Sequence, residues 1–241
     1  SRGANGVILV TTKKGKEGKV TLNYSGTVSI ETLHDVTEMM SAAEWLDYAR
    51  LAKYNMNSYP SITPDYEADK MAFGSVAASW ANIEKAWSDG KYDPSKVGSY
   101  DWASHGKQTG ITHEHTLSAS GGSEKFQGYG SFGYLSQKGT QPGQSYERFT
   151  LKTSFDATPL PYFKMGTSVN AKSVTGAGDL YNALRSMLPW TVPYDDNGDY
   201  IRNPNGDVNI INPIRELDYN TNQRRTFRAN ASMYAQVDFG K

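Results

Sequence analysis

Long stretches in which apolar and polar residues alternate constrain this chain more than any other feature. The clearest cover residues 19–31, 146–157, 163–172 and 226–239. Because neighbouring side chains of a strand point to opposite faces, each stretch predicts a strand with one apolar and one polar face. Each stretch has roughly 10–14 residues, which exceeds the usual globular strand of about 5–6 and suffices to cross a bilayer at a tilt.

Residues 112–121 and 125–137 also predict strands, although their two faces are less cleanly sorted. Short and long connections alternate along the chain. Short links are predicted at Gly122–Glu124 and Thr158–Pro161. The other ends of the strands carry long links from Thr32 to Ile111 and from Thr175 to Arg224, and one of a few residues at Lys138–Ser145. Short turns at one end and long loops at the other are typical of an outer-membrane β-barrel. A large soluble β-sandwich with one wet face is the alternative.

The first long link contains two helical patterns. Ser41 precedes Glu44 by three residues, which predicts a capping box at the start of a helix. A second run places Ala77, Trp80, Ile83 and Trp87 at spacings of three and four, and we interpret this aromatic stripe as packing rather than ligand contact.

The second long link contains an acidic run, Asp195–Asp199. It lacks the ligand spacing and the closing Glu of an EF-hand, so a type I′ turn at Asn197–Gly198 explains it better than a calcium loop. His113 and His115 share a strand face and would supply half a metal site, but a solvated or interfacial pair is the simpler interpretation.

Composition excludes several functions. Lys plus Arg and Asp plus Glu are 25 each, so the net charge of zero gives no case for a nucleic-acid partner. The chain has no Cys, which excludes disulfides and thiol catalysis. It also has no apolar run of transmembrane-helix length, no Gly-x-Ser-x-Gly motif, no Walker motif and no HExxH motif. We therefore expect neither an enzyme nor a cofactor or metal site.

The start of the chain carries a specific motif. Residues 1–15 read SRGANGVILVTTKKG, and this run resembles the end of the plug domain in TonB-linked outer-membrane proteins of the SusC/RagA family. The residues that carry the family motif are Ser1, Arg2, Gly3, Ala4, Asn5 and Gly6.

Further matches follow in the family's order over nearly the whole chain. Asp101-Trp102 and residues 110–122 resemble the entry into an early barrel strand. Residues 134–150 resemble the next hairpin, and Pro193-Tyr194 with Asn197-Gly198 resembles a recurrent loop element.

The resemblance implies an all-β fold, a transmembrane antiparallel β-barrel of which this chain holds about six of an expected 22 strands. Residues 1–16 would be the C-terminal end of the plug, and residues 17–241 the N-terminal part of the barrel. The long links, with their short helices, would be extracellular loops. Because six strands cannot close a membrane barrel, we expect the intact polypeptide to begin before Ser1 and to continue beyond Lys241.

The resemblance also implies a function and a location. It implies TonB-dependent import of a large nutrient, usually a glycan and in some members a peptide, across the outer membrane of a Gram-negative cell. The implied partners are a SusD-like surface lipoprotein, the TonB–ExbB–ExbD complex and outer-membrane lipid. Trp102, Trp190 and Tyr194 are the candidate substrate contacts, because aromatic rings stack on sugars, although packing explains each one alone.

Two other functions stay open from the sequence. One is a TonB-dependent receptor for an iron chelate or cobalamin, which growth on defined glycans and uptake of iron chelates by a deletion strain would separate from a glycan importer. The other is a soluble β-rich binding domain, which membrane fractionation would test.

Overall fold

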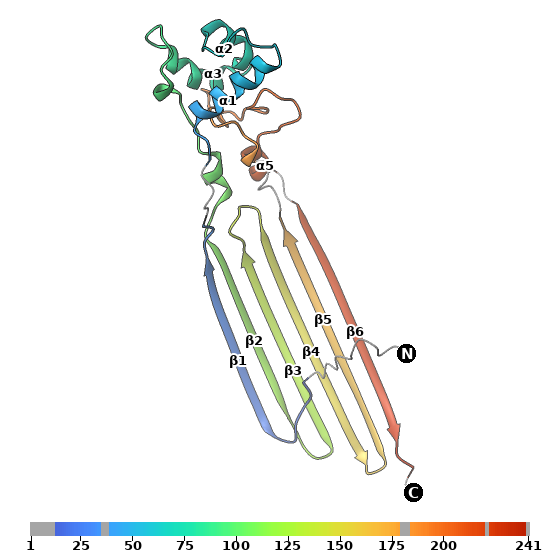
Figure 1. Ribbon diagram of the computed structural model, residues 1–241. Coiled ribbons are helices and arrows are strands. Elements are labelled where there is room, and N and C mark those ends of the chain that lie inside the picture. Colours follow the sequence, from blue (N-terminus) through green and yellow to red (C-terminus); the bar gives the residue numbers. More distant parts are fainter. Residues whose placement is uncertain (1–12, 35–38, 179–183, 220–221, 240–241) are drawn as a thin grey trace, which may run out of the picture.

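The computed structural model describes residues 13–34, 39–178, 184–219 and 222–239. Its main feature is one antiparallel sheet of six strands that follow one another in sequence order (Figure 1). The strands are β1 (Gly18–Glu31), β2 (Gly110–Gly122), β3 (Phe126–Lys138), β4 (Ser145–Leu160), β5 (Phe163–Ala177) and β6 (Gln223–Val237). The six strands predicted from alternation are therefore confirmed, and each has 13–16 residues.

Tight turns join the strands at the lower end of the sheet in Figure 1. Between β2 and β3 the Ser123 N–H donates to the Phe126 carbonyl at 2.7 Å. Gly122 adopts a φ of 156°, which side-chain-bearing residues rarely adopt, so glycine suits the start of this turn. The turn predicted at Gly122–Glu124 is confirmed, displaced by one residue.

The second turn is shorter than predicted. The predicted link began at Thr158, but β4 continues to Leu160, which pairs with Phe163. The reason is that the Thr158 N–H still donates to the Lys125 carbonyl of the neighbouring hairpin at 2.8 Å. An irregularity in register between Ala157 and Leu160 accommodates the proline between them.

The helices lie in the two long loops at the other end of the sheet, where they form a cap (Figure 1). The loop between β1 and β2 carries α1 (Ala42–Asn55), α2 (Tyr66–Phe73), α3 (Ala77–Glu84), η1 (Lys85–Trp87), η2 (Pro94–Lys96) and η3 (Trp102–Gly106). The loop between β5 and β6 carries α5 (Pro213–Tyr219). In the described part of the chain, no helix combines the length and the apolar character needed to span a bilayer.

The predicted capping box is confirmed. The Glu44 N–H donates to Ser41 Oγ at 3.2 Å, and Glu44 Oε2 accepts from the Ser41 N–H at 2.8 Å. The second helical pattern forms α3 but ends at Glu84, after which the chain tightens into the 3₁₀ turn η1 that holds Trp87.

The hydrophobic core lies in the cap rather than in the sheet. One cluster contains Ala42, Leu46, Phe73, Trp80, Ile83 and Trp190, and a second contains Trp102, Leu184, Met187 and Ile214. Among the described residues of the sheet, only Ala157 is a buried apolar side chain. The all-β fold class was therefore too narrow. The part of the molecule that has a hydrophobic core contains the helices, and the sheet is a single layer.

A buried ion pair joins α1 to α2. Arg50 and Asp69 are 1% and 0% exposed, and Arg50 donates to both carboxylate oxygens of Asp69, at 2.9 and 2.6 Å. Burial by itself would lower the pKa of Arg50, but the hydrogen bonds and charge of Asp69 hold that pKa above its ordinary value. Tyr59 also donates to Asp69 at 2.8 Å, and burial together with this contact raises the pKa of Tyr59 to about 12.

Candidate functional site

One face of the sheet is apolar across all six strands. Partners in an antiparallel pair lie on the same face, so the register decides which side chains gather there. One row across the sheet on this face is Tyr24, Leu117, Phe132, Leu151, Ala171 and Ala229. Leu117, Phe132 and Leu151 are 52%, 50% and 46% exposed, because the described residues place no second layer over them.

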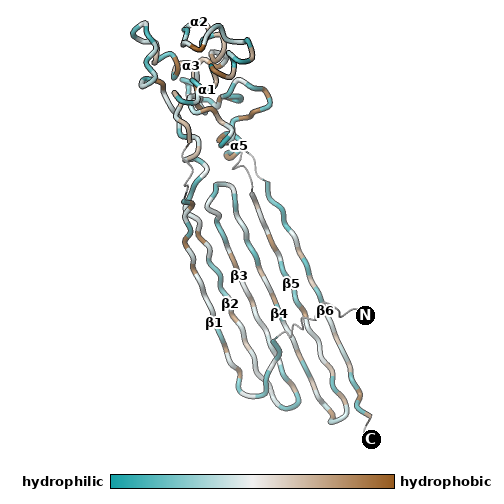
Figure 2. The backbone as a smooth tube through the Cα atoms, in the orientation of Figure 1, coloured by the Kyte–Doolittle hydropathy of each residue, from teal (hydrophilic) through white to brown (hydrophobic). Residues whose placement is uncertain are grey.

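The opposite face is polar. The next row along the strands is Ser25, Thr116, Gly133, Thr150, Lys172 and Arg228. On this face Arg148 of β4 reaches across β3 and pairs with Glu114 of β2 at 2.8 Å. Figure 2 shows the resulting alternation of hydrophobic and hydrophilic positions along the strands. The sheet is therefore suited to separate an apolar environment from an aqueous one.

The segment before β1 lies on the polar face. Lys14 Nζ is 3.2 Å from Asp156 Oδ1 of β4. A groove runs between this segment and the sheet, and its lining residues are Lys13, Lys14, Lys16, Glu17, Lys19, Thr21, Asn23, Ser118, Ser120 and Tyr129. The family-motif residues Ser1, Arg2, Gly3, Ala4, Asn5 and Gly6 lie outside the described residues. The division at residue 16 stays a prediction.

Two of the three predicted substrate contacts are core residues of the cap. Trp190 is 3% exposed and packs edge to face against Phe73, with ring centroids 5.7 Å apart. Trp102 is also 3% exposed, and its indole N–H donates to the Thr191 carbonyl at 3.0 Å. Both indoles are therefore almost fully buried in the cap.

Tyr194 is the most accessible of the three. It is 38% exposed, and its ring lies 4.9 Å from that of Tyr200. The two residues form an isolated antiparallel bridge that closes a small hairpin. The structure thus separates Tyr194 from the two buried tryptophans, and substrate contact by all three residues stays a prediction.

The acidic run forms the tip of this small hairpin, but its turn type was predicted wrongly. A type I′ turn needs positive φ at both Asn197 and Gly198, whereas of these two only Gly198 has it, at 84°. The Gly198 N–H donates to the Asp195 carbonyl at 3.0 Å. The Asp195 carboxylate also accepts from the Asn197 and Asp199 N–H groups, at 2.9 and 3.0 Å. The side chain of Asp195 thereby stabilises an Asx-type turn instead.

The two long loops exchange core residues, which the sequence pattern did not reveal. Trp190 of the second loop completes the first loop's cluster, and Trp102 of the first loop completes the second loop's cluster. Two hydrogen bonds reinforce the exchange: the Tyr100 N–H donates to the Pro189 carbonyl at 2.7 Å, and the Asn82 side-chain Nδ2 donates to the Trp190 carbonyl at 2.9 Å. The tryptophan spacing predicted packing, but no local pattern could name partners about 100 residues away.

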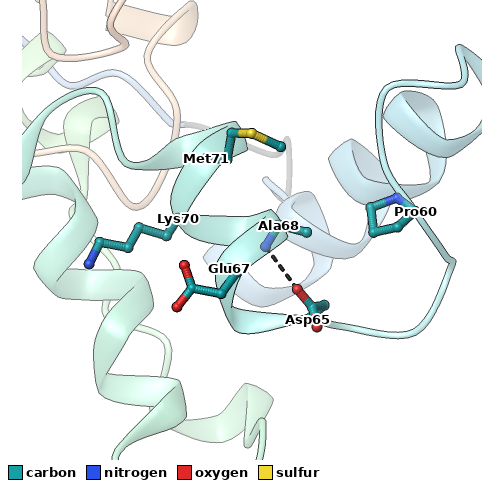
Figure 3. Close-up of a pocket in the computed structure, with 6 residues that line it drawn as sticks. All are labelled: Pro60, Asp65, Glu67, Ala68, Lys70 and Met71. Atoms are coloured by element: carbon teal, nitrogen blue, oxygen red, sulfur yellow. Dashed lines mark hydrogen bonds between the residues drawn. The ribbon is translucent and has the colours of Figure 1, made fainter.

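An apolar cavity of about 590 Å³ opens between the two loops. Its apolar wall is made of Met39, Met40, Trp45, Tyr100, Trp102, Leu184, Met187, Leu188 and Pro189. A shallower pocket lies beside the N-terminus of α2 (Figure 3). There the Asp65 carboxylate is already used as a cap, because it accepts from the Ala68 N–H at 2.9 Å. Neither cavity brings together an acid, a base and a nucleophile.

His113 and His115 lie side by side on the apolar face, as expected for neighbours two apart on a strand. Their ring centroids are 5.4 Å apart. His115 Nδ1 is 2.7 Å from the Tyr24 hydroxyl, and His113 lies against Tyr134, with ring centroids 5.6 Å apart. Across the described residues, no group of three His, Cys, Asp or Glu side chains is placed to hold a metal ion.

Comparison with known proteins finds relatives of this chain, but no family model matches it. It is 27% identical over 252 residues to TonB-dependent receptor P3 of Formosa agariphila, an alignment that covers 99% of this chain and 21% of that protein. It is 24% identical over 234 residues to TonB-dependent receptor SusC of Bacteroides thetaiotaomicron, covering 92% and 20%. The chain spans about a fifth of the length of the curated relatives it matches.

Solved structures share the fold. The RagAB peptide importer in its open-open state matches with a TM-score of 0.69 at 19% identity, over 100% of this chain and 28% of that one. Its closed-closed state matches with a TM-score of 0.67 at 20% identity, over 99% and 28%.

In sequence the chain is similar to part of TonB-dependent receptors, and its two-faced sheet has the fold of part of the RagAB peptide importer. Among receptors of that class, the chain resembles a segment of the SusC/RagA type, about a fifth of the full length.

Proposed function

We propose that this chain forms the plug-to-barrel junction and the first six strands of a TonB-dependent barrel that imports a large nutrient across the outer membrane. Most simply the nutrient is a glycan, and a peptide is the second class. A SusD-like surface lipoprotein covers the mouth of the barrel, and the TonB–ExbB–ExbD complex supplies the energy. The two-faced sheet is the observation that carries this proposal.

The apolar face supports a lipid environment. Val20, Leu22 and Ile30 of β1 are 74%, 70% and 71% exposed, and Phe227 and Met233 of β6 are 70% and 84% exposed. Removing such a side chain from water contributes about 1.5–3 kcal/mol, so a sheet that leaves a whole row of them in water would associate or aggregate. Lipid covers this face without a second protein layer.

Strand length and orientation support the same environment. The 13 residues of β3 extend over about 43 Å at ~3.3 Å per residue, which still spans a hydrocarbon core of about 30 Å when the strand is tilted by about 45°. The polar face would line the lumen, which is consistent with the position of Lys14 on that side. In the proposed barrel further strands pair with the outer edges of β1 and β6, because unpaired backbone groups cost several kcal/mol each in lipid.

The loop cap supports a role in recognition at the cell surface. Its two loops share cores, so they present one rigid surface above the sheet rather than two independent loops. Tyr194 is the aromatic residue of the predicted set that a passing ligand could reach. The glycan is drawn from the resemblance to the SusC/RagA family, and the peptide from the RagAB peptide importer, whose fold the chain shares.

Growth and uptake assays test the transport function. A strain that lacks the complete receptor gene should lose growth on the receptor's glycan or peptide as sole carbon source, and should grow normally on glucose. Plasmid-borne receptor should restore growth, and loss of TonB should abolish the restored growth. A deletion strain that grows on every glycan and peptide tested but fails to take up an iron chelate or cobalamin would replace this proposal with the receptor alternative.

Fractionation tests the location independently. The complete receptor should remain with the outer membrane after a carbonate wash and should enter solution only with detergent. Recovery in the aqueous phase without detergent would refute the barrel and favour a soluble binding domain.

A further inference from the structure

The connection between the segment before β1 and the rest of the sheet is a small polar cluster. Lys14 crosses the polar face and places its ammonium group 3.2 Å from Asp156 Oδ1 on β4. The same oxygen accepts a hydrogen bond from the Tyr234 hydroxyl of β6 at 2.7 Å. Lys14 Nζ also lies 5.5 Å from the centre of the Tyr234 ring. One carboxylate therefore joins three parts of the chain that are far apart in sequence.

Glycines make the room for this cluster. Gly166 of β5 pairs with Asp156 on one side and with Tyr234 on the other. A Cβ atom at Gly166 would stand 2.5 Å from the Tyr234 ring and 2.7 Å from Asp156 Oδ1, so only glycine lets the tyrosine reach across β5. Gly15 is buried, and a Cβ there would overlap the backbone of Gly128 on β3.

We propose that Lys14, Asp156 and Tyr234 form a reversible latch that holds the junction segment, residues 13–17, against the polar face of the sheet. The close fit of Gly15 on Gly128 determines where the junction segment crosses the polar face, and the Lys14–Asp156 ion pair determines whether the segment remains bound there. Lys14 remains 56% exposed, so its pairing is hydrated and opens at low cost. A hydrated ion pair of this kind suits a contact that breaks and re-forms, rather than a permanent one.

The role of the latch in transport rests on the proposed function. A plug that precedes residue 13 would be joined covalently to the barrel through the junction segment. Traction on that plug would load the Lys14–Asp156 contact before it loads the hydrogen bonds between β1 and β2. The latch would thus mark the point at which plug movement stops being free and begins to strain the barrel wall.

Limited proteolysis of the full-length receptor in outer-membrane preparations tests the latch directly. Trypsin cleavage after Lys16, read by mass spectrometry, reports release of the junction segment, because cleavage follows the population of the open form. Asp156→Asn should increase this cleavage about two- to fivefold, the range expected for a hydrated ion pair. Asp238→Asn is the matched control, because Asp238 pairs with Lys164 at 3.4 Å and touches no junction residue.

A charge exchange separates the latch from general damage. The double variant Lys14→Asp with Asp156→Lys restores the opposite charges in reversed order and should bring cleavage back toward the wild-type rate. Tyr234→Phe keeps the ring but removes the hydroxyl, so it should increase cleavage less than Asp156→Asn does. Equal cleavage of Asp156→Asn and Asp238→Asn, or no recovery in the double variant, would overturn the latch. Because cleavage is measured without transport, a failed latch is distinguishable from a failed transport function, which the uptake assay reads.

Discussion

The buried ion pair of the cap makes the sharpest prediction. Asp69 is the shared acceptor for Arg50 at 2.9 and 2.6 Å, for the Tyr59 hydroxyl at 2.8 Å and for the Trp87 indole N–H at 3.2 Å. Asp69→Asn keeps the shape of the side chain but removes its charge. The guanidinium of Arg50, 1% exposed, would then be left in the core without its buried counter-charge.

The expected cost is large. Removing one partner of a buried pair destabilises a protein by about 3–5 kcal/mol, chiefly because the other charge stays buried without compensation. At about 1.4 kcal/mol per factor of ten, local opening of α1 and α2 should rise by roughly 100- to 1,000-fold or more. Replacing both partners, as in Arg50→Met with Asp69→Leu, should recover much of this loss, since two apolar side chains need no counter-charge.

Amide hydrogen exchange of the detergent-solubilised receptor measures this opening at α1 and α2. Asp47→Asn is the matched control, because Asp47 contacts the same Arg50 at 2.7 Å but its side chain is 59% exposed. An exposed pair contributes at most about 1 kcal/mol, so the control should change exchange by fivefold or so at most. If Asp69→Asn and Asp47→Asn changed protection equally, the assignment of the cap's stability to the buried pair would be refuted.

Three further predictions concern the helix cap, the loops and the sheet. The hydrogen bond from the Ser41 backbone N–H, and after it that from the Ser41 hydroxyl, lowers the pKa of Glu44. The capping box therefore stabilises α1 fully above the ordinary glutamate pKa, and this stabilisation is lost as the pH falls through the lowered pKa. Ser41→Ala should cost about 0.5–2 kcal/mol of local stability and flatten that pH dependence, which hydrogen exchange at the first turn of α1 would detect, and an unchanged pH profile would contradict it. Trp190→Ala should lower the stability of the loop region by about 3–5 kcal/mol and should raise proteolysis in the helices of the β1–β2 loop. Cleavage confined to the β5–β6 loop, which holds Trp190, would argue against shared cores. In the proposed barrel, Phe132→Arg should lower the amount of heat-modifiable, folded receptor in the membrane by a cost of about 2–4 kcal/mol, whereas Ser131→Arg, one residue away on the polar face, should leave it nearly unchanged.

The strands and their faces could be predicted from the sequence because their determinants are local. Alternation at a period of two is written in neighbouring residues, and β1 and β4 begin within one residue of where the pattern placed them. The capping box of Ser41 and Glu44 is equally local, and it formed as predicted. Two predictions about turns were wrong. Pairing with the neighbouring hairpin extended β4 to Leu160 beyond the expected turn, and the Asp195 side chain replaced a type I′ turn with an Asx-type turn.

The candidate site was less predictable, because its members are far apart in the chain. Trp102 and Trp190 stood out in the sequence as exposed-loop aromatics, yet each completes a core whose other members come largely from the other loop. The carboxylate of Asp156 gave no signal in the sequence, because an aspartate on the polar face of a two-faced strand is common. Only the register that places it beside Tyr234, and the path that brings Lys14 across the polar face, gives it a role.

The sequence by itself therefore determined a sheet of long strands, each with a polar and an apolar side, and two long loops at one end of the strands. Alternation is a property of consecutive residues, so it survives without knowledge of the fold. Only the tertiary structure decided that all six apolar sides coincide, that the loops share their cores, and that Lys14 meets Asp156. Those outcomes depend on strand register and on distant contacts such as Lys14–Asp156, 142 residues apart, which no local pattern encodes.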